Sequence, residues 1–235
     1  MGRAFEFRKA RKFKRWAAMS KTFTRIGKEI AMAVKEGGPD PENNTRLRNA
    51  IQNSKSANMP KDTVDRAIKK ASSKDQEDFK EVNYEGYAPH GIAVLVECAT
   101  DNITRTVANV RSYFNKCNGS LGTSGSVEFL FERKCNFKIE KGDRDPEELE
   151  LEMIDFGIEE LFEEDEFIMI YGEFTAFGNI QRGLEQLGIP VVESGYERLP
   201  LNTTELNEEQ QADVEKLLER LEEDEDVLNV YHTMA

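Results

Sequence analysis

Cysteine is scarce in this chain, and no two cysteines lie close together in the sequence. Cys98, Cys117 and Cys135 are 19 and 18 residues apart, without the C-x-x-C pairs that are typical of structural zinc sites. An odd number of widely spaced thiols predicts a reducing compartment, where they act as small buried apolar groups. We therefore expect neither a disulfide framework nor a metal site built from these thiols and His90, and we expect no cofactor.

Long apolar runs are also absent. No run approaches the roughly 18 residues that a membrane-spanning helix needs. The basic start of the chain lacks the apolar segment of a secretory signal, although it is amphipathic and poor in acidic residues, as mitochondrial transit peptides are. The default expectation is a cytoplasmic protein with no membrane partner. The 235 residues are 38% apolar and include 14 Phe, which is enough for real cores and predicts two or three domains.

Charge is distributed very unevenly along the chain. Residues 1–74 carry 19 Lys and Arg against 7 Asp and Glu, a net charge of +12. The remaining residues carry 13 against 38, a net charge of −25, so that the whole chain sums to −13. This asymmetry predicts an N-terminal part that faces nucleic acid or an acidic partner, joined to an acidic body.

The basic part is predicted to be an arm followed by three helices. The arm, "RAFEFRKARKFKRW", interleaves aromatic residues with Lys and Arg. Apolar residues at helical spacing predict helices over residues 22–35, about 45–57 and 60–71. The last, "PKDTVDRAIKKA", has one apolar arc formed by Val64, Ala67, Ile68 and Ala71. Its i,i+4 spacings predict two ion pairs, Asp62–Arg66 and Asp65–Lys69, which would leave Lys61 and Lys70 unpaired.

The acidic body alternates strand and helix patterns after a predicted linker at residues 75–83. Strands are predicted over residues 91–99, 126–134, 166–174, 191–199 and 227–233, and helices over 101–119, 175–188 and 207–224. This order favours an α+β fold: an N-terminal helical bundle at 1–78 plus two ferredoxin-like α/β domains. One domain would comprise 79–133 and 200–235, and the other, 134–199, would be inserted in it.

Three long blocks resemble the YebC/PmpR family. They are "EGGPDPENNTRLRNAIQNSKSANMPKDTVDRAIKKA", "YEGYAPHGIAVLVECATDNITRTVANVRSYFNKCNGSLGTSGSVEFLFER" and "LNEEQQADVEKLLERLEEDEDVLNVYHTM". The resemblance implies a helical N-terminal domain and two α/β domains, one inserted in the other. It also implies a transcriptional regulator that binds DNA, although mitochondrial relatives are translational activators and the family has been tied to the ribosome. The chain departs from the family at residues 1–19, which lack the usual Gly-His-Ser-Lys-Trp opening, and at Ala88 and His90, where glycines are common.

The candidate nucleic-acid-binding residues are cations of the basic part that could neutralise phosphates and release counterions. They are Arg8, Lys9, Arg11, Lys12, Lys14, Arg15, Lys21, Arg25, Lys61 and Lys70. Phe13 or Trp16 could stack on an unpaired base. Alternatively Phe13, Trp16 and Ala17, at i, i+3 and i+4, pack the arm onto the bundle.

Other motifs receive structural interpretations. The Gly-rich loop 118–127 could cradle a phosphate, but it lacks a Walker ending and precedes a strand, so a helix end followed by a turn is favoured. Asp101 is expected to cap its helix and to pair with Arg105 at i,i+4. Segment 143–166 carries 13 Asp and Glu and one Arg, which predicts a solvated face or, alternatively, a divalent-cation site.

No catalytic constellation is visible, which favours a non-enzymatic regulator of gene expression. We also expect a monomer. We expect a DNA-binding transcriptional regulator that docks through the basic domain. Two alternatives stay open: a ribosome-associated translation factor on structured RNA, and an interaction module for an acidic protein. There is no clear helix-turn-helix spacing and no RNP-type aromatic motif, which favours recognition of shape and backbone over base readout.

Overall fold

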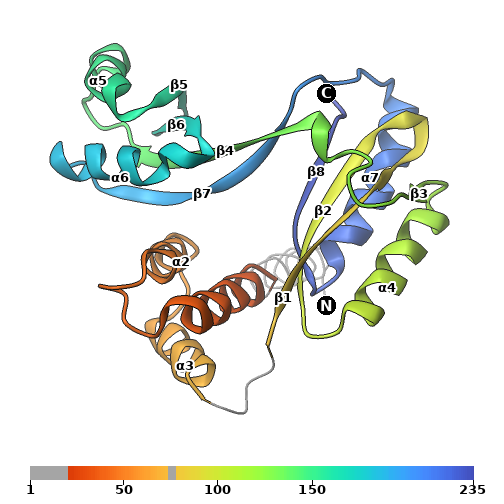
Figure 1. Cartoon of the computed structure of the whole chain (residues 1–235). Coiled ribbons are helices and arrows are strands. Elements are labelled where there is room, and N and C mark those ends of the chain that lie inside the picture. The colour runs from red at the N-terminus through yellow and green to blue at the C-terminus, as the bar shows by residue number, and fades with distance from the viewer. Residues whose placement is uncertain (1–20, 74–77) are drawn as a thin grey trace, which may run out of the picture.

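The N-terminal part is a bundle of three helices in the computed structural model, which describes residues 21–73 and 78–235 (Figure 1). The helix at residues 21–37 is followed by α2 (Thr45–Ser56) and α3 (Lys61–Ala71). Asn44 joins the first two helices, because its Oδ1 accepts from Leu47 N at 3.0 Å while its Nδ2 donates to Ala33 O at 2.7 Å. One side chain thus caps the start of α2 and holds the preceding helix against it.

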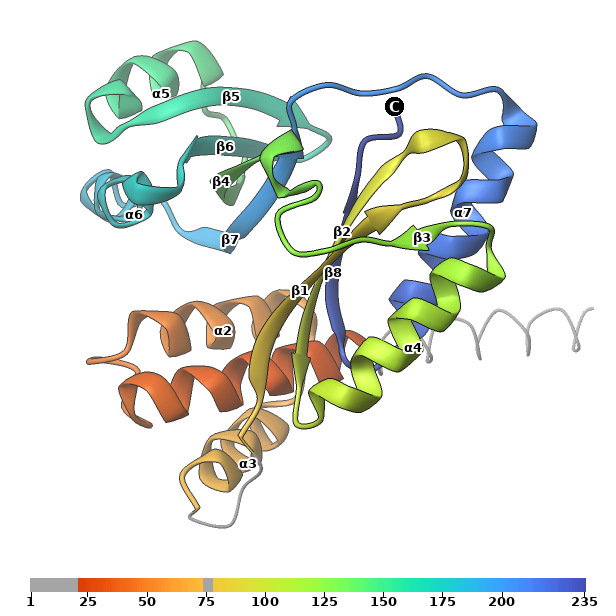
Figure 2. The same cartoon turned by 45° about the vertical axis from the view of Figure 1, so that its right-hand side comes forward.

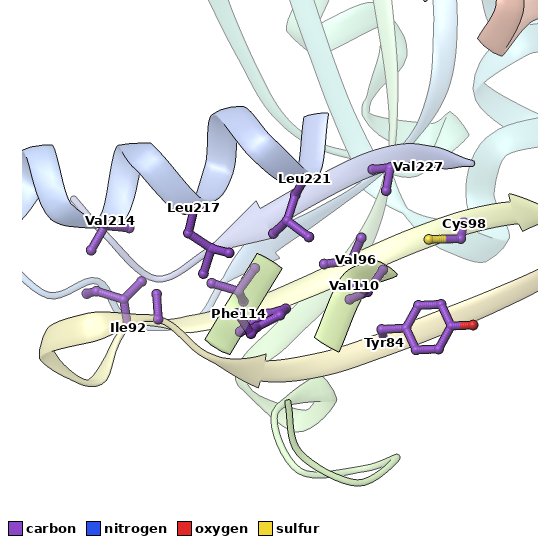
Figure 3. Close-up of a cluster of buried hydrophobic side chains, with 12 residues drawn as sticks. Tyr84, Ile92, Val96, Cys98, Val110, Phe114, Val214, Leu217, Leu221 and Val227 are labelled. Atoms are coloured by element: carbon purple, nitrogen blue, oxygen red, sulfur yellow. The ribbon is translucent and has the colours of Figure 1, made fainter. Parts of the chain in front are cut away.

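The first sheet has the strand order β3-β1-β2-β8, with antiparallel neighbours throughout. Its strands are β1 (Lys80–Tyr87), β2 (Ala93–Thr100), β3 (Ser120–Leu121) and β8 (Val227–His232). Helices α4 (Ile103–Lys116) and α7 (Glu208–Glu223) cover one face, where Val96 and Cys98 of β2 meet Phe114 and Leu217 (Figure 3). The neighbouring residues on β2 point to the opposite face, because strand side chains alternate.

The second sheet has the order β5-β6-β4-β7 and is also antiparallel. Its elements follow in the chain order β4 (Phe131–Glu140), α5 (Pro146–Met153), β5 (Ile158–Glu164), β6 (Phe167–Glu173), α6 (Phe177–Gln186) and β7 (Val191–Pro200). This is the β-α-β-β-α-β order of ferredoxin-like folds. Both helices pack against this sheet around Phe137, Ile170 and Leu184. Figure 2 shows α5 and α6 beside its strands.

The predicted α+β fold class is confirmed, but two local predictions are wrong. The linker predicted to reach residue 83 ends earlier, because β1 begins at Lys80 and pairs with strands on both sides. The strand predicted at 126–134 begins only at Phe131, after a 3-10 turn at Glu128–Leu130, and runs on to Glu140. The acidic segment forms α5 and β5, and all 13 of its Asp and Glu residues are exposed, as the predicted solvated face requires. In the described part of the chain, no helix is long and apolar enough to cross a bilayer.

Candidate nucleic-acid interface

The predicted phosphate-binding cations divide into two groups. Six of them, and the aromatic residues of the arm, lie outside the described residues: Arg8, Lys9, Arg11, Lys12, Phe13, Lys14, Arg15 and Trp16. The other four lie in the bundle, with Lys21 and Arg25 one turn apart on the helix at 21–37 and with Lys61 and Lys70 on α3.

Lys21 and Arg25 lie one turn apart on the helix at 21–37, and Arg25 contacts α7. Arg25 Nη2 donates to the Glu222 carbonyl oxygen at 3.4 Å, near the C-terminal end of α7. The last carbonyls of a helix carry partial negative charge, so a guanidinium is favoured there. Arg25 is half-buried and already has this partner, whereas half-buried Lys21 has no partner among the described residues.

The outer face of α3 presents exposed cations. At about 100° per residue, Arg66, Lys69 and Lys70 lie on the side of α3 opposite the buried Val64, whereas Lys61 lies about 60° from Val64, at the start of the helix. The predicted pairs Asp62–Arg66 and Asp65–Lys69 are wrong, since neither is within ion-pair distance in the structure. Arg66 turns back instead, and its Nε donates to the carbonyl of Asp62 at 3.0 Å. Lys61 and Lys70 are therefore both exposed on α3 but point to opposite sides of it, about 180° apart.

A buried lysine attaches the bundle to the first sheet. Lys28 Nζ lies 3.0 Å from Asp226 Oδ1 and donates to the carbonyls of Ala99 at 2.8 Å and Glu225 at 2.7 Å. The side chains of Lys28 and Asp226 are 9% and 8% exposed. Met32, one turn further along, is buried beside Ala99, so this helix has a second inward face. Sequence reasoning missed Lys28, because its partners lie far away in the chain.

Asp226 is the centre of this junction. Its Oδ2 accepts from Arg105 Nη2 and Thr106 Oγ1, both at 2.8 Å. Burial alone would raise the pKa of Asp226, but these donors together with Lys28 lower it to about 2. Arg105 also pairs with Asp101 at 2.7 Å, as predicted. The predicted cap at Asp101 is wrong, because Asn102 caps α4 by accepting from Arg105 N at 3.0 Å.

Amide side chains attach the bundle to the second sheet as well. β7 is an edge strand of that sheet, and α2 lies beside it (Figure 1). Asn53 makes two bonds to Ser194, with Nδ2 donating to the carbonyl at 2.8 Å and Oδ1 accepting from the N–H at 3.1 Å. Gln52 Nε2 donates to Val191 O at 2.7 Å. These contacts satisfy backbone groups that an open sheet edge would expose.

The glycine-rich loop that could have cradled a phosphate is occupied by a carboxylate of the chain itself. Glu85, only 3% exposed, accepts from the N–H groups of Gly125 at 2.6 Å and of Val127 and Glu128, both at 2.7 Å. Burial would raise the pKa of Glu85, but these three donors lower it. The loop therefore has a structural role, because its N–H groups are already used.

The thiols and acidic side chains do not assemble into a metal site within the described residues. Cys98 and Cys135 are buried, and burial raises the pKa of Cys98 to about 12 and that of Cys135 to about 11. A surface cavity of about 520 Å³ lies where the bundle meets β1, and Arg46 lines it. Arg46 pairs there with Glu36 at 2.9 Å and with Glu29 at 3.3 Å.

Comparisons with known proteins cover nearly the whole sequence. Residues 3–74 match the family profile described as "TACO1/YebC protein N-terminal domain", and residues 79–234 match "TACO1/YebC second and third domain". A "Probable transcriptional regulatory protein" of Flavobacterium psychrophilum is 66% identical over 234 residues, covering 100% of this chain and 99% of that protein. One from Porphyromonas gingivalis with the same description is 60% identical, covering 100% and 97%.

A solved structure is also similar in fold. The crystal structure of a conserved hypothetical protein from Aquifex aeolicus matches with a TM-score of 0.81 and 40% identity, covering 92% of this chain and 90% of that one. The two sheets, the N-terminal bundle and these similarities in sequence agree, and the chain belongs to the TACO1/YebC family.

Proposed function

We propose that this chain is a non-enzymatic regulator of gene expression that binds nucleic acid through its basic N-terminal part. Duplex DNA is the first candidate for that ligand. Two relatives at 66% and 60% identity are described as probable transcriptional regulatory proteins, which supports the regulatory role. The observation that carries nucleic-acid binding is the pair of exposed cations Lys61 and Lys70 on α3, which have no carboxylate partner in the described part of the chain.

The distribution of charge along the chain also supports docking of nucleic acid at the N-terminal part. The net charge is +12 over residues 1–74 and −25 over the rest, so a polyanion is attracted to one end and repelled by the other. The bundle is fixed to both sheets through Lys28 and Asn53, which gives its cations a defined orientation. Exposed lysines on a short helix suit contact with phosphates rather than the reading of base edges.

The test measures the salt dependence of binding with the full-length chain. Fluorescence anisotropy of a labelled DNA duplex gives the affinity over a range of salt concentrations. Each lost phosphate contact should lower the slope of log K against log salt by about 0.9, so K61Q/K70Q should lower it by up to about 1.8. The control variant R111Q/K116Q removes two exposed cations from α4 and should leave the slope unchanged.

The competitors in this assay separate the classes of ligand. A particular duplex that resists unrelated duplex and structured ribosomal RNA supports a regulator with an operator. If the RNA displaces the labelled duplex at far lower concentration, the result would instead support a function in translation. If wild type binds no probe, or if the slope is the same in K61Q/K70Q, the proposal is wrong.

A further inference from the structure

An aromatic ladder runs from the core of the second sheet to its surface. The ring centroids of Phe137 and Phe177 are 4.7 Å apart, those of Phe177 and Tyr196 are 5.0 Å apart, and those of Tyr196 and Phe174 are 4.7 Å apart. The two inner rings are buried, whereas Phe174 and Tyr196 are 37% and 42% exposed. The exposed rings are therefore held in place by buried ones, which makes them rigid at the surface.

An arginine without an ion-pair partner lies on this exposed end. The guanidinium carbon of Arg133 is 4.0 Å from the centroid of Phe174 and 5.2 Å from that of Tyr196. Arg133 is exposed, and none of the described carboxylates is within ion-pair distance of it. An unpaired cation is notable in a part of the chain so rich in Asp and Glu. Its contacts with the rings orient the guanidinium without using its charge.

The hydroxyl of Tyr196 is also available. It has no hydrogen-bond partner among the described residues. Burial of the ring raises the pKa of Tyr196, so the hydroxyl keeps its proton at neutral pH and can donate. The cluster therefore offers an aromatic surface, a planar cation and a hydroxyl donor at one place.

We propose that Arg133, Phe174 and Tyr196 form a stacking site for one unpaired nucleobase of the bound nucleic acid. Aromatic rings and guanidinium planes are the surfaces on which unpaired bases stack, and arginine can also contact the adjoining phosphate. The proposal rests on the proposed function, to which it adds a second contact and a preference for a distorted or single-stranded site.

The position of the cluster suits such a second contact. Tyr196 is on β7, the strand that lies beside α2 of the basic bundle in both overall views (Figures 1 and 2). Asn53 of α2 bonds to the backbone of Ser194, two residues before Tyr196 on the same strand. The surrounding acidic surface repels a long stretch of phosphates, so the site suits a single nucleotide that leaves its strand next to the bundle.

The experiment compares paired and unpaired probes on the full-length chain. The probes are duplexes that carry 2-aminopurine either in a single-base bulge or fully paired, made in DNA and in RNA so that the preferred source is identified. Wild type should bind the bulged probe more tightly and quench its fluorescence by stacking. F174A and R133M should each weaken binding of the bulged probe by about 5- to 100-fold, and should leave the paired probe unaffected.

Matched controls come from the same sheet and its helices. F162A removes a ring that is 41% exposed and stacked on Tyr171 with centroids 5.8 Å apart, away from the ladder. R182M removes an exposed arginine on α6. R133K keeps the charge but loses the planar group, and it should bind the bulged probe nearly as weakly as R133M.

The outcomes separate the two proposals. If wild type binds both probes but F174A and R133M behave like F162A and R182M, the stacking site is wrong and the proposed function stands. Equal losses for bulged and paired probes would also overturn it, since they would indicate a general folding or charge effect. If wild type binds neither probe, both proposals fail together.

Discussion

Replacing Lys28 by methionine should loosen the N-terminal bundle from the first sheet. The substitution keeps an unbranched apolar side chain, one heavy atom shorter, and removes the ammonium that donates to Asp226 and to the carbonyls of Ala99 and Glu225. Removing one partner of a buried ion pair typically costs about 3–5 kcal/mol. Asp226 keeps its bonds to Arg105 and Thr106, so we expect the lower part of that range, about 3 kcal/mol.

The pKa of Asp226 supports a cost of this size. Its decrease from the ordinary value of 3.8 to about 2 corresponds to about 2.5 kcal/mol of stability, shared among all its donors. Because the pKa is lower in the folded state, this stability is present at neutral pH and is lost as the pH falls from about 4 to about 2. In D226N that acid-dependent part should be missing, which urea titrations at several pH values can measure.

Amide hydrogen exchange gives the local measurement for K28M, since a chain with three packed parts need not unfold in one step. The free energy of opening should fall in the helix at 21–37 and in β2. The matched control is K35M on the same helix, where Lys35 pairs with Asp78 and the two side chains are 36% and 74% exposed. An exposed pair of this kind contributes about 0–1 kcal/mol. Equal effects of K28M and K35M would refute the role of the buried junction.

Three further substitutions test other parts of the structure. E85Q should lower the free energy of unfolding by about 2–4 kcal/mol, because it replaces a carboxylate that accepts three N–H bonds. The amides of the loop that donate these bonds should then exchange faster. G86A should destabilise by about 2 kcal/mol or more in urea titrations, because its Cβ would lie 2.5 Å from a carbonyl oxygen, whereas G178A in α6 has open space and should be neutral or slightly stabilising. N53A should lower the free energy of opening at the junction with β7 by about 1–2 kcal/mol, measured as faster amide exchange at Ser194. An unchanged exchange rate there would argue against the contact.

Sequence patterns predicted the elements that carry a regular apolar stripe. The helices now labelled α2, α3, α6 and α7, and the strands β6 to β8, have bounds within two residues or so of the predicted ones. Of the strands that were missed, β1 and β5 carry many charges, and β3 (Ser120–Leu121) is only 2 residues long. β1 carries the buried Glu85, which breaks the alternation, and β5 is a glutamate-rich edge strand.

The site was less predictable than the fold, because identical residues have different roles. Lys28, Lys35 and Lys61 are all lysines of the basic part, yet the first is buried in an ion pair, the second has an exposed partner and the third is exposed without one in the described part of the chain. Only the partner identifies the role, and the partner of Lys28 lies 198 residues away. Net charge could therefore predict the region that binds, but not the residues that remain available for a ligand.

Two junctions fix the orientation of the basic bundle relative to the acidic body. A tethered basic domain could turn toward the acidic body and be neutralised by it. Here Lys28 fixes one helix to the first sheet and Asn53 fixes the next to an edge of the second, so a rotation that suited one junction would break the other. Both junctions use buried or half-buried hydrogen bonds, which salt screens much less than exposed charge pairs. The orientation of the exposed face of α3 should therefore persist at salt concentrations that abolish binding to phosphates, and the salt dependence of affinity then measures the contacts themselves rather than a rearrangement of the bundle.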